Sequence, residues 1–466
     1  MIRKILWKEL LTNLRSLRLS LTFILLVLSM MVAGLVFSQK YHQITEDYDR
    51  DVNTDLQGIR DRAKSINDLA FHPHCLYKSP NPMCLCAEGR EKYTPNSFLI
   101  TICQIDGMEN RTRLNFLRAR LEDLDWAFII GVIVSFAAII LTYDAISGER
   151  EDGTLKLMMS NSVSRASIIL GKYLGGIVSL LIPLVAAIIL NLIIVLILGA
   201  NFTPEQWGRI GMISLISLVY TSCFLMLGLF VSSLTRSSTV SLVILLFLWT
   251  VLIAIVPSSG RIAAGKLQPV TPGRIISKSL GDTWSQVGDT YPKDTFNWNG
   301  WNRSRPVPDQ VLRRGKCTWD IREVQDRIRD DHRNEMLRQL RFAQNLVRVS
   351  PMMTYTFLCE AIAGTGSSRF ESFMGQVKRF RDEWREWIFG EDKKDEDSCH
   401  VLSAESWTNS YSEKEPDFGH LPRFSEKLPS LRDSLQSGLL DLSLLMLFNV
   451  VLFMASYLVF MRYDVR

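Results

Sequence analysis

Six apolar segments constrain this chain more than any other feature of its 466 residues. A helix that crosses a bilayer needs roughly 20 mainly apolar residues, and each segment approaches or exceeds that length. The sequence therefore predicts an all-α polytopic membrane protein with six transmembrane helices. The predicted spans are 19–37, 126–143, 174–198, 210–234, 240–256 and 438–460.

The basic residues beside the spans predict the orientation. Six crossings place both termini on one side, and Lys and Arg near spans are retained in the cytoplasm. We therefore expect a multi-pass protein of the bacterial cytoplasmic (inner) membrane with both termini cytoplasmic. Cytoplasmic segments are then 1–18, 144–173 and 461–466, and extracytoplasmic segments are 38–125 and 257–437. The basic residues of the first two cytoplasmic segments include Arg3, Lys4, Lys8, Arg15, Arg18, Arg150, Lys156, Arg165 and Lys172.

Residues 1–18 have helical periodicity, with apolar side chains on one face and basic side chains around the other. This pattern favours an amphipathic elbow helix on the inner leaflet over a simple basic flank of the first span. No clear small-x-small cleavage site follows residues 19–37, so we expect an uncleaved span rather than a signal peptide. The apolar face consists of Ile2, Ile5, Leu6, Leu10, Leu14 and Leu17.

The segment 257–437 is predicted to form a mainly helical extracytoplasmic domain. Charged helices with apolar stripes are expected at Thr318–Val349 and Ser368–Phe389, separated by Pro351 and a Gly-rich turn. These stripes fit the core of a helical hairpin or small bundle better than a ligand groove. The net charge of +5 is too small for this length to indicate nucleic-acid binding.

The segment 144–173 contains the most informative motif. Gly153 and Thr154 can end one helix and begin another, on which Leu155, Met158 and Met159 offer an apolar face. A short helix of this kind can dock into a partner and transmit its movement to the spans. The cytoplasmic segments are too short for a nucleotide-hydrolysing domain, so ATP and Mg would be bound by a partner chain.

This segment resembles the corresponding loop of ABC-2 type ABC transporter permeases, where Glu-Arg-Glu-x-Gly-Thr-Leu is followed by Val-Ser-Arg and Gly-Lys-Tyr-Leu. Ser162 departs from the Pro that the family often has there. A second resemblance, to long family members with a large extracytoplasmic domain, precedes the last span. The matching residues are Glu149, Arg150, Glu151, Gly153, Thr154, Leu155, Val163, Ser164, Arg165, Gly171, Lys172, Tyr173 and Leu174, then Ser350, Pro351, Tyr355, Glu360, Ala361, Ala363, Gly364, Thr365 and Gly366.

The resemblance implies an exporter in which two permease chains, identical or different, form the pathway and a cytoplasmic ATPase dimer drives it. It implies contacts with the ATPase through this loop, although such a charged run can also be a solvated face. An alternative is a mechanotransmission complex that acts on a cell-envelope partner through the outer domain. The expected coupling residues are Glu149, Arg150, Glu151, Asp152, Gly153, Thr154, Leu155 and Arg165.

The spans carry few charged groups and no His, Glu or paired acids, which argues against an intramembrane enzyme. We therefore expect no catalytic residues. A pathway without fixed charges favours an amphipathic cargo, such as a lipid or a peptide, over a small ion.

Seven of the eight cysteines fall in predicted extracytoplasmic segments, where disulfides are favoured. Cys84 and Cys86 are too close in sequence to pair with each other easily, so Cys75 and Cys103 are their expected partners in either connectivity. A metal site formed by His72, His74, Cys75, Cys84 and Cys86 is the weaker alternative, because their spacing matches no firm metal motif. The remaining candidates for disulfides are Cys317, Cys359 and Cys399.

Overall fold

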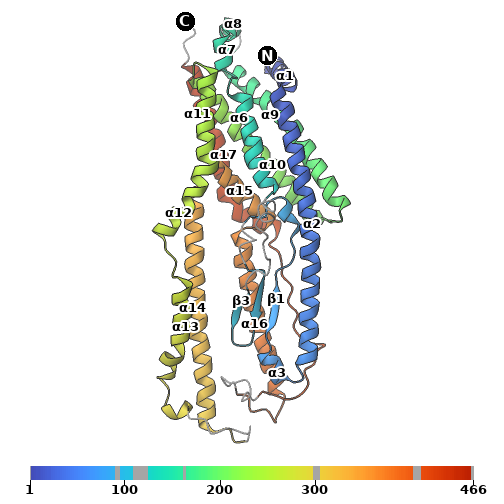
Figure 1. The fold of residues 1–466 in the computed structure, drawn as a ribbon, viewed down its shortest axis with the longest axis vertical. Coiled ribbons are helices and arrows are strands. Elements are labelled where there is room, and N and C mark those ends of the chain that lie inside the picture. The colour runs from blue at the N-terminus through green and yellow to red at the C-terminus, as the bar shows by residue number, and fades with distance from the viewer. Residues whose placement is uncertain are drawn as a thin grey trace.

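The computed structural model describes residues 2–89, 95–108, 124–160, 164–296, 305–401 and 411–462. It contains six helices that are long and apolar enough to cross a membrane, which confirms the predicted class. Figure 1 shows these helices as a bundle with both termini at one end, here called the terminal end. The helices are α2 (Leu17–Arg62), α5 to α7 (Trp126–Glu151), α9 (Arg165–Ile197), α10 (Pro204–Leu234), α11 to α12 (Ser238–Leu267) and α17 (Leu431–Met461).

Two of these helices are interrupted by π-helical turns. The second runs through α5 (Trp126–Ile129), the turn η3 (Ile130–Val134), α6 (Ser135–Thr142) and, after a short turn, α7 (Ser147–Glu151). The fifth runs through α11, the turn η4 and α12. The parts of the fifth helix are α11 (Ser238–Thr250), η4 (Val251–Ile255) and α12 (Val256–Leu267).

The helix α10 lies at the centre of the bundle, and 72% of the residues in its most apolar stretch are buried. A short helix from outside the six, α15 (Pro351–Ala363), packs into the same core. Its Tyr355 ring stacks on Tyr220 with ring centroids 4.3 Å apart, and the Tyr355 hydroxyl lies 2.8 Å from that of Ser217. Tyr220 in turn donates to the carbonyl of Gly131 in the π-helical turn at 2.7 Å. The polar atoms of these rings are thus satisfied inside an apolar environment.

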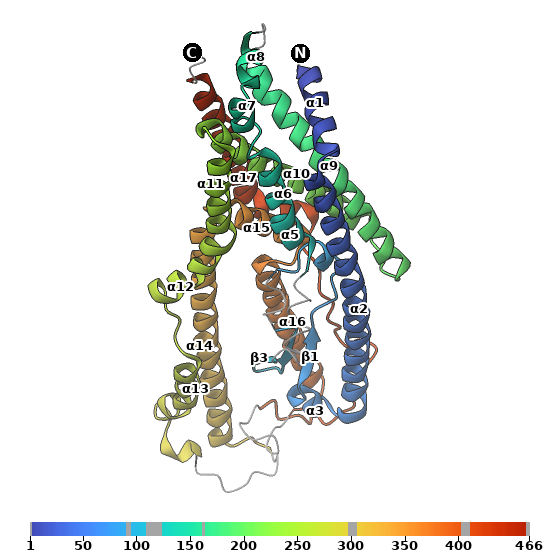
Figure 2. The same cartoon turned by 45° about the horizontal axis from the view of Figure 1, so that its top comes forward.

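Most of the other described residues form an elongated domain at the other end, here called the distal domain. Figure 2 shows α2 and α14 (Asp309–Val347) as its two long walls, with α16 (Ser367–Lys393) and a small sheet between them. The antiparallel sheet has the order β1-β2-β3 and pairs His74 with Ile100 and Ile100 with Ile105. Its strands are β1 (His74–Tyr77), β2 (Ser97–Ile100) and β3 (Ile105–Met108).

The apolar stripe predicted on Ser368–Phe389 forms the core of the distal domain. Phe373, Val377, Trp384 and Ile388 of α16 are all at most 1% exposed and pack against the sheet and α3 (Ile66–Phe71). The domain is mainly helical, as predicted, but the strands were not expected, since each has only four residues. The described residues also form the helix α13 (Gly273–Gly288) and the single 3-10 turns η1 (Pro82–Leu85) and η5 (Lys293–Phe296).

The element boundaries differ from the apolar segments in physically understandable ways. The helix that contains the predicted span 19–37 continues to Arg62, because its charged second half packs within the distal domain instead of facing lipid. The helix that contains 240–256 likewise continues to Leu267 and packs beside α14. The segment 257–437 includes α15, which lies in the core of the bundle. Length and hydropathy thus locate the spans without fixing where the helices end.

The cysteines are distributed over separate parts of the fold. The structure contains no disulfide among the described residues, so the predicted disulfides stay a prediction. Cys86 and Cys359 are fully buried together in the core of the bundle. Cys103, by contrast, packs against the apolar core of the distal domain. Cys86 and Cys103 therefore belong to different packing clusters.

Cys103 supplies a prediction about pH. Burial raises the pKa of the Cys103 thiol to about 11, because the thiolate would lose its hydration. We expect the alkylation rate of Cys103 to rise about tenfold per pH unit up to pH ~11, since only the thiolate reacts. In the unfolded chain the same thiol has a pKa of about 8.5. Between about pH 8.5 and pH 11 the unfolded chain therefore releases this proton while the folded protein keeps it, so the free energy of unfolding falls as pH rises through this range. Mass spectrometry of iodoacetamide-treated protein measures the rate, and a plateau near pH 9 would contradict the shift.

Candidate coupling site

The coupling site begins with the close approach of two helices at the terminal end. The predicted elbow forms as α1 (Ile2–Leu14) and packs along α9 (Figure 1). Gly171 and Gly175 of α9 face it, and a Cβ at either position would lie 2.7 Å from a side-chain carbon of Ile5 or Glu9. Small residues one turn apart allow helix backbones to approach closely. The motif glycine at 171 therefore has a packing role against the elbow.

A buried ion network joins three elements beside this contact. The ammonium of Lys172 on α9 lies 2.8 Å from Glu9 on α1 and 2.9 Å from Glu149 on α7, and its side chain is 3% exposed. Lys8 approaches Glu149 at 3.4 Å from the exposed side. Two carboxylates that share one buried ammonium hold all three helices at fixed separations. Glu149, predicted to contact the ATPase, is thus directed into the permease.

Arg150 and Glu151 fasten the same short helix to the turn between α10 and α11. The Arg150 guanidinium donates to the carbonyls of Thr235 at 2.6 Å and Ser233 at 3.2 Å, which lie at the end of α10. Helix C-termini leave such carbonyls without intrahelical partners. Glu151 accepts from the hydroxyl of Ser238 at 2.6 Å, at the start of α11. These two charges link the loop to the fourth and fifth membrane helices.

Arg165 extends the connections to the last membrane helix. From the first turn of α9 its guanidinium donates to the carbonyls of Phe460 at 3.1 Å and Met461 at 2.5 Å. Both carbonyls lie in the last turn of α17, where a cation is favoured by the helix dipole. The predicted coupling charges Glu149, Arg150, Glu151 and Arg165 therefore bind other parts of the permease.

The surface left for a partner is α8 (Thr154–Ser160) and the turn before it. Asp152, Gly153 and Thr154 are exposed, and Gly153 has φ +70°, a left-handed conformation that glycine adopts without strain. Leu155 is only 1% exposed and packs with Ile146 and other residues of the terminal-end core. Leu157, by contrast, is 73% exposed.

Leu157 was missed by sequence reasoning, which assigned the apolar face of this helix to Leu155, Met158 and Met159. Helical spacing places those three on the side that packs onto the bundle and leaves Leu157 on the opposite side. A single apolar residue outside the periodic face is a weak signal, although here it marks the exposed side. Val163 of the motif lies outside the described residues.

The second motif, before the last span, proves to be α15 and its caps. Ser350 donates to the carbonyl of Leu252 at 2.6 Å, and Tyr355 stacks inside the bundle as described above. Gly364 ends the helix in the left-handed conformation at φ +67°. The hydroxyl of Thr365 then donates to the carbonyl of Ala87 at 2.6 Å. Ala87 packs in the core of the bundle, so the motif fixes α15 and its C-terminal cap within that core.

The five candidate metal ligands of the sequence lie on or beside β1 and η1. Within the described residues, no group of three or more His, Cys, Asp or Glu side chains is arranged to hold a metal ion. His74 instead bonds to Asp55 at 2.5 Å through Nδ1, and its ring stacks on Trp384 with centroids 5.3 Å apart. His72, Cys75, Cys84 and Cys86 do not join it in such a group.

Comparison with known proteins identifies the family of the chain. A model of the ABC-2 family transporter proteins matches residues 3–465, nearly the whole chain. No curated protein matches the sequence. The match includes the elbow, all six membrane helices and the whole distal domain. The chain therefore belongs to the ABC-2 family of transporter proteins and is a membrane-spanning permease subunit of an ABC transporter, not itself catalytic.

Proposed function

We propose that this permease is an exporter subunit whose terminal end faces the cytoplasm of a bacterial inner membrane and is driven by ATPases on separate chains. The basic residues of α1 and of the loop from α7 to α9 support this orientation. Two permease chains, identical or different, would form the pathway, and ATP and Mg would be held by the partner ATPases. The distal domain would then lie outside the cytoplasm.

One observation carries the proposal: α8 presents an exposed apolar side chain from a loop whose charges bind α1, α9, α11, α17 and the end of α10. Leu157 and the adjacent exposed turn form the surface on which an ATPase would dock. Displacement of that surface would be transmitted through Glu149 to the elbow and α9, through Arg150 and Glu151 to α10 and α11, and through Arg165 to α17. Rigid polar links between packed helices suit such transmission.

Leu157→Glu tests the docking surface. An apolar side chain that becomes fully buried at an interface contributes roughly 1.5–3 kcal/mol, so we expect recovery of the ATPase with the tagged permease to fall by at least about tenfold. Leu157→Met is the matched control, because it keeps an apolar side chain of similar size. The measurement is co-purification from membranes in mild detergent, followed by an ATPase assay.

The two variants separate docking from folding. Because the Leu157 side chain is 73% exposed, both variants should be obtained as intact, monodisperse protein. Stoichiometric recovery of an active ATPase with Leu157→Glu would exclude this face as the docking surface. A change at Glu149 or Glu151 would be less informative, since it breaks contacts inside the permease itself.

The alternative, a mechanotransmission complex, is not supported by the family match, which is to transporter proteins. For cargo, most polar side chains inside the bundle bond to backbone carbonyls or to one another. The hydroxyl of Ser222, for example, lies 2.6 Å from Tyr173 and donates to Asn449 at 2.7 Å. Satisfied polar groups of this kind serve helix packing. We therefore propose an amphipathic cargo, a lipid or a peptide, over a small ion.

A further inference from the structure

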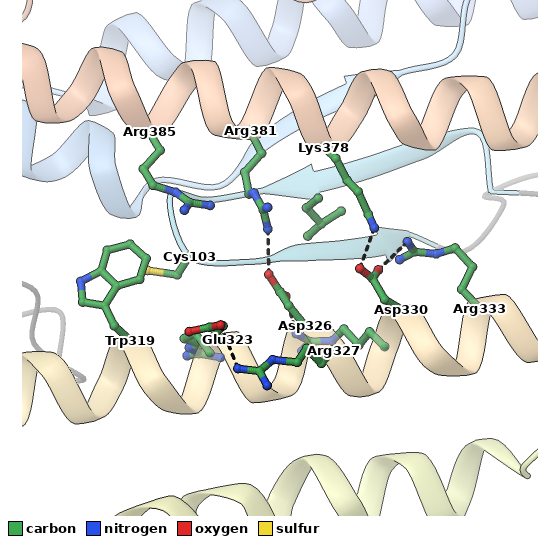
Figure 3. Close-up of a pocket in the computed structure, with 13 residues that line it drawn as sticks. Cys103, Trp319, Glu323, Asp326, Arg327, Asp330, Arg333, Lys378, Arg381 and Arg385 are labelled. Atoms are coloured by element: carbon green, nitrogen blue, oxygen red, sulfur yellow. Dashed lines mark hydrogen bonds and ion pairs between the residues drawn. The ribbon is translucent and has the colours of Figure 1, made fainter.

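The distal domain contains a cleft that is separate from the candidate coupling site. It lies between α14 and α16, beside the turn from β2 to β3, and has a volume of about 340 Å³. Figure 3 shows Lys378, Arg381 and Arg385 projecting from α16 toward Asp326 and Asp330 of α14. A cleft of this size is within the range of small-molecule sites, which is roughly 300–1,000 Å³.

The lining carries a large excess of positive charge. Seven of the lining side chains are Arg or Lys and three are Asp or Glu, a surplus of four positive charges, of which Asp106 and Asp382 just outside the lining each offset one. Two of the carboxylates each form ion pairs with two basic side chains. Asp326 lies 2.7 Å from Arg381 and 3.5 Å from Arg329, and Asp330 lies 2.6 Å from Lys378 and 2.9 Å from Arg333.

Arg322 shows the imbalance most clearly. Its guanidinium donates to the amide oxygens of Gln104 at 2.5 Å and Gln325 at 3.1 Å and forms no ion pair among the described residues. Arg385 lies over the ring of Trp319 at 5.6 Å and donates to the carbonyl of Ile102 at 3.0 Å. Its carboxylate partner, Asp382, is itself shared with Arg381.

A merely structural salt-bridge network would have charges near balance, because unpaired cations repel one another and lose hydration in a cleft. Here cations from two helices converge and outnumber the anions. We propose that this cleft is an oxyanion site that takes a ligand of the phosphate class, with Arg322 and Arg385 as its principal donors. The planar guanidinium matches the oxygens of a phosphate with two parallel hydrogen bonds.

The position of the cleft selects the source of the ligand. Asp326 precedes Val347, where α14 meets the membrane helix α12, by 21 residues of continuous helix. At 1.5 Å per residue this is about 32 Å, beyond the reach of a headgroup that stays in the bilayer. The ligand is therefore a soluble phosphate compound or the phosphorylated end of an envelope molecule, and not a lipid embedded in the membrane.

The test measures binding of inorganic pyrophosphate to the full-length protein in nanodiscs of zwitterionic lipid, by isothermal titration calorimetry. We expect saturable binding that weakens as salt is raised, because the contacts are ionic. Arg322→Gln and Arg385→Gln should each weaken binding by at least about tenfold, as expected for loss of a charged hydrogen bond. Arg322→Lys keeps the positive charge but lacks the two parallel N–H donors of the guanidinium, so it should give an intermediate affinity.

Arg338→Gln is the matched control. It removes the same charge from the same helix at an exposed position outside the cleft, so its affinity should equal that of the wild type. Repetition in nanodiscs that contain phosphatidylglycerol separates the sources, since competition there would overturn the assignment to a soluble ligand. Absence of binding to the wild type at millimolar pyrophosphate, or equal affinities for Arg322→Gln, Arg385→Gln and Arg338→Gln, would overturn the site itself.

Discussion

Lys172→Met is expected to cause the largest loss of stability and activity among single changes at the terminal end. It removes the one ammonium that Glu9 and Glu149 share and leaves two carboxylates facing each other with little exposure. Removal of one partner from a buried ion pair costs about 3–5 kcal/mol. The elbow should separate from α7, so we expect a lower thermal unfolding midpoint and loss of ATPase stimulation by the permease.

Lys8→Met is the control for this experiment. Lys8 also pairs with Glu149, but its side chain is 62% exposed and the distance is 3.4 Å. Exposed pairs contribute about 0–1 kcal/mol, so the midpoint should hardly change. The triple change Lys172→Met with Glu9→Gln and Glu149→Gln removes all three buried charges and should recover much of the lost stability. Equal midpoints for Lys172→Met and Lys8→Met would show that the network is not structural.

Gly228→Ala is expected to be the most disruptive small change inside the bundle. A Cβ at Gly228 of α10 would lie 1.8 Å from Oγ1 and 2.8 Å from Cβ of Thr142 on α6. Neither atom belongs to a flexible side-chain end, since the Thr142 hydroxyl is bonded to the carbonyl of Ala138 at 2.6 Å. The helices must separate, and overpacking of this kind typically costs about 1–3 kcal/mol or more. The yield of monodisperse protein and its melting temperature measure the effect.

Gly211→Ala on the same helix is the matched control, because no atom lies within 4 Å of its added Cβ. It should leave the melting temperature unchanged or raise it slightly, since Ala favours helix more than Gly does. Thr142→Ala combined with Gly228→Ala should restore part of the loss by removing the hydroxyl that lies closest. If Gly228→Ala and Gly211→Ala have the same melting temperature, the close contact between α10 and α6 is not needed for stability.

The six spans were predictable because crossing a bilayer demands length and apolar content, and both are visible in the sequence. The sequence does not predict that the short helix α15 lies in the bundle, because its 13 residues are too few for a membrane span. Only the surrounding helices reveal its place, through contacts such as that between Tyr355 and Tyr220. The three strands were not predicted either, because a strand of four residues shows little periodicity in the sequence.

The coupling residues show a different limit of sequence reasoning. Their charges predicted an exposed surface, because isolated charged side chains seldom lie buried. Their partners, however, lie far away in the chain: Lys172 reaches back to Glu9, and Arg165 binds the carbonyls of α17. Distant pairing turns a charged segment inward, and no local pattern reports it. The motif predicts which segment carries the site, whereas the direction of each side chain required the fold.

The length of α14 has a mechanical consequence. Its base is held tightly: a Cβ at Gly260 of α12 would lie only 2.0 Å from Val347, and the adjoining Arg348 binds Asp441 of α17 at 2.6 and 3.0 Å. A helix of 39 residues measures about 58 Å, so a tilt of roughly 5° at this base swings its far tip by about 5 Å. A small rotation at the membrane end of α14 would therefore displace the remote end by more than the diameter of a water molecule.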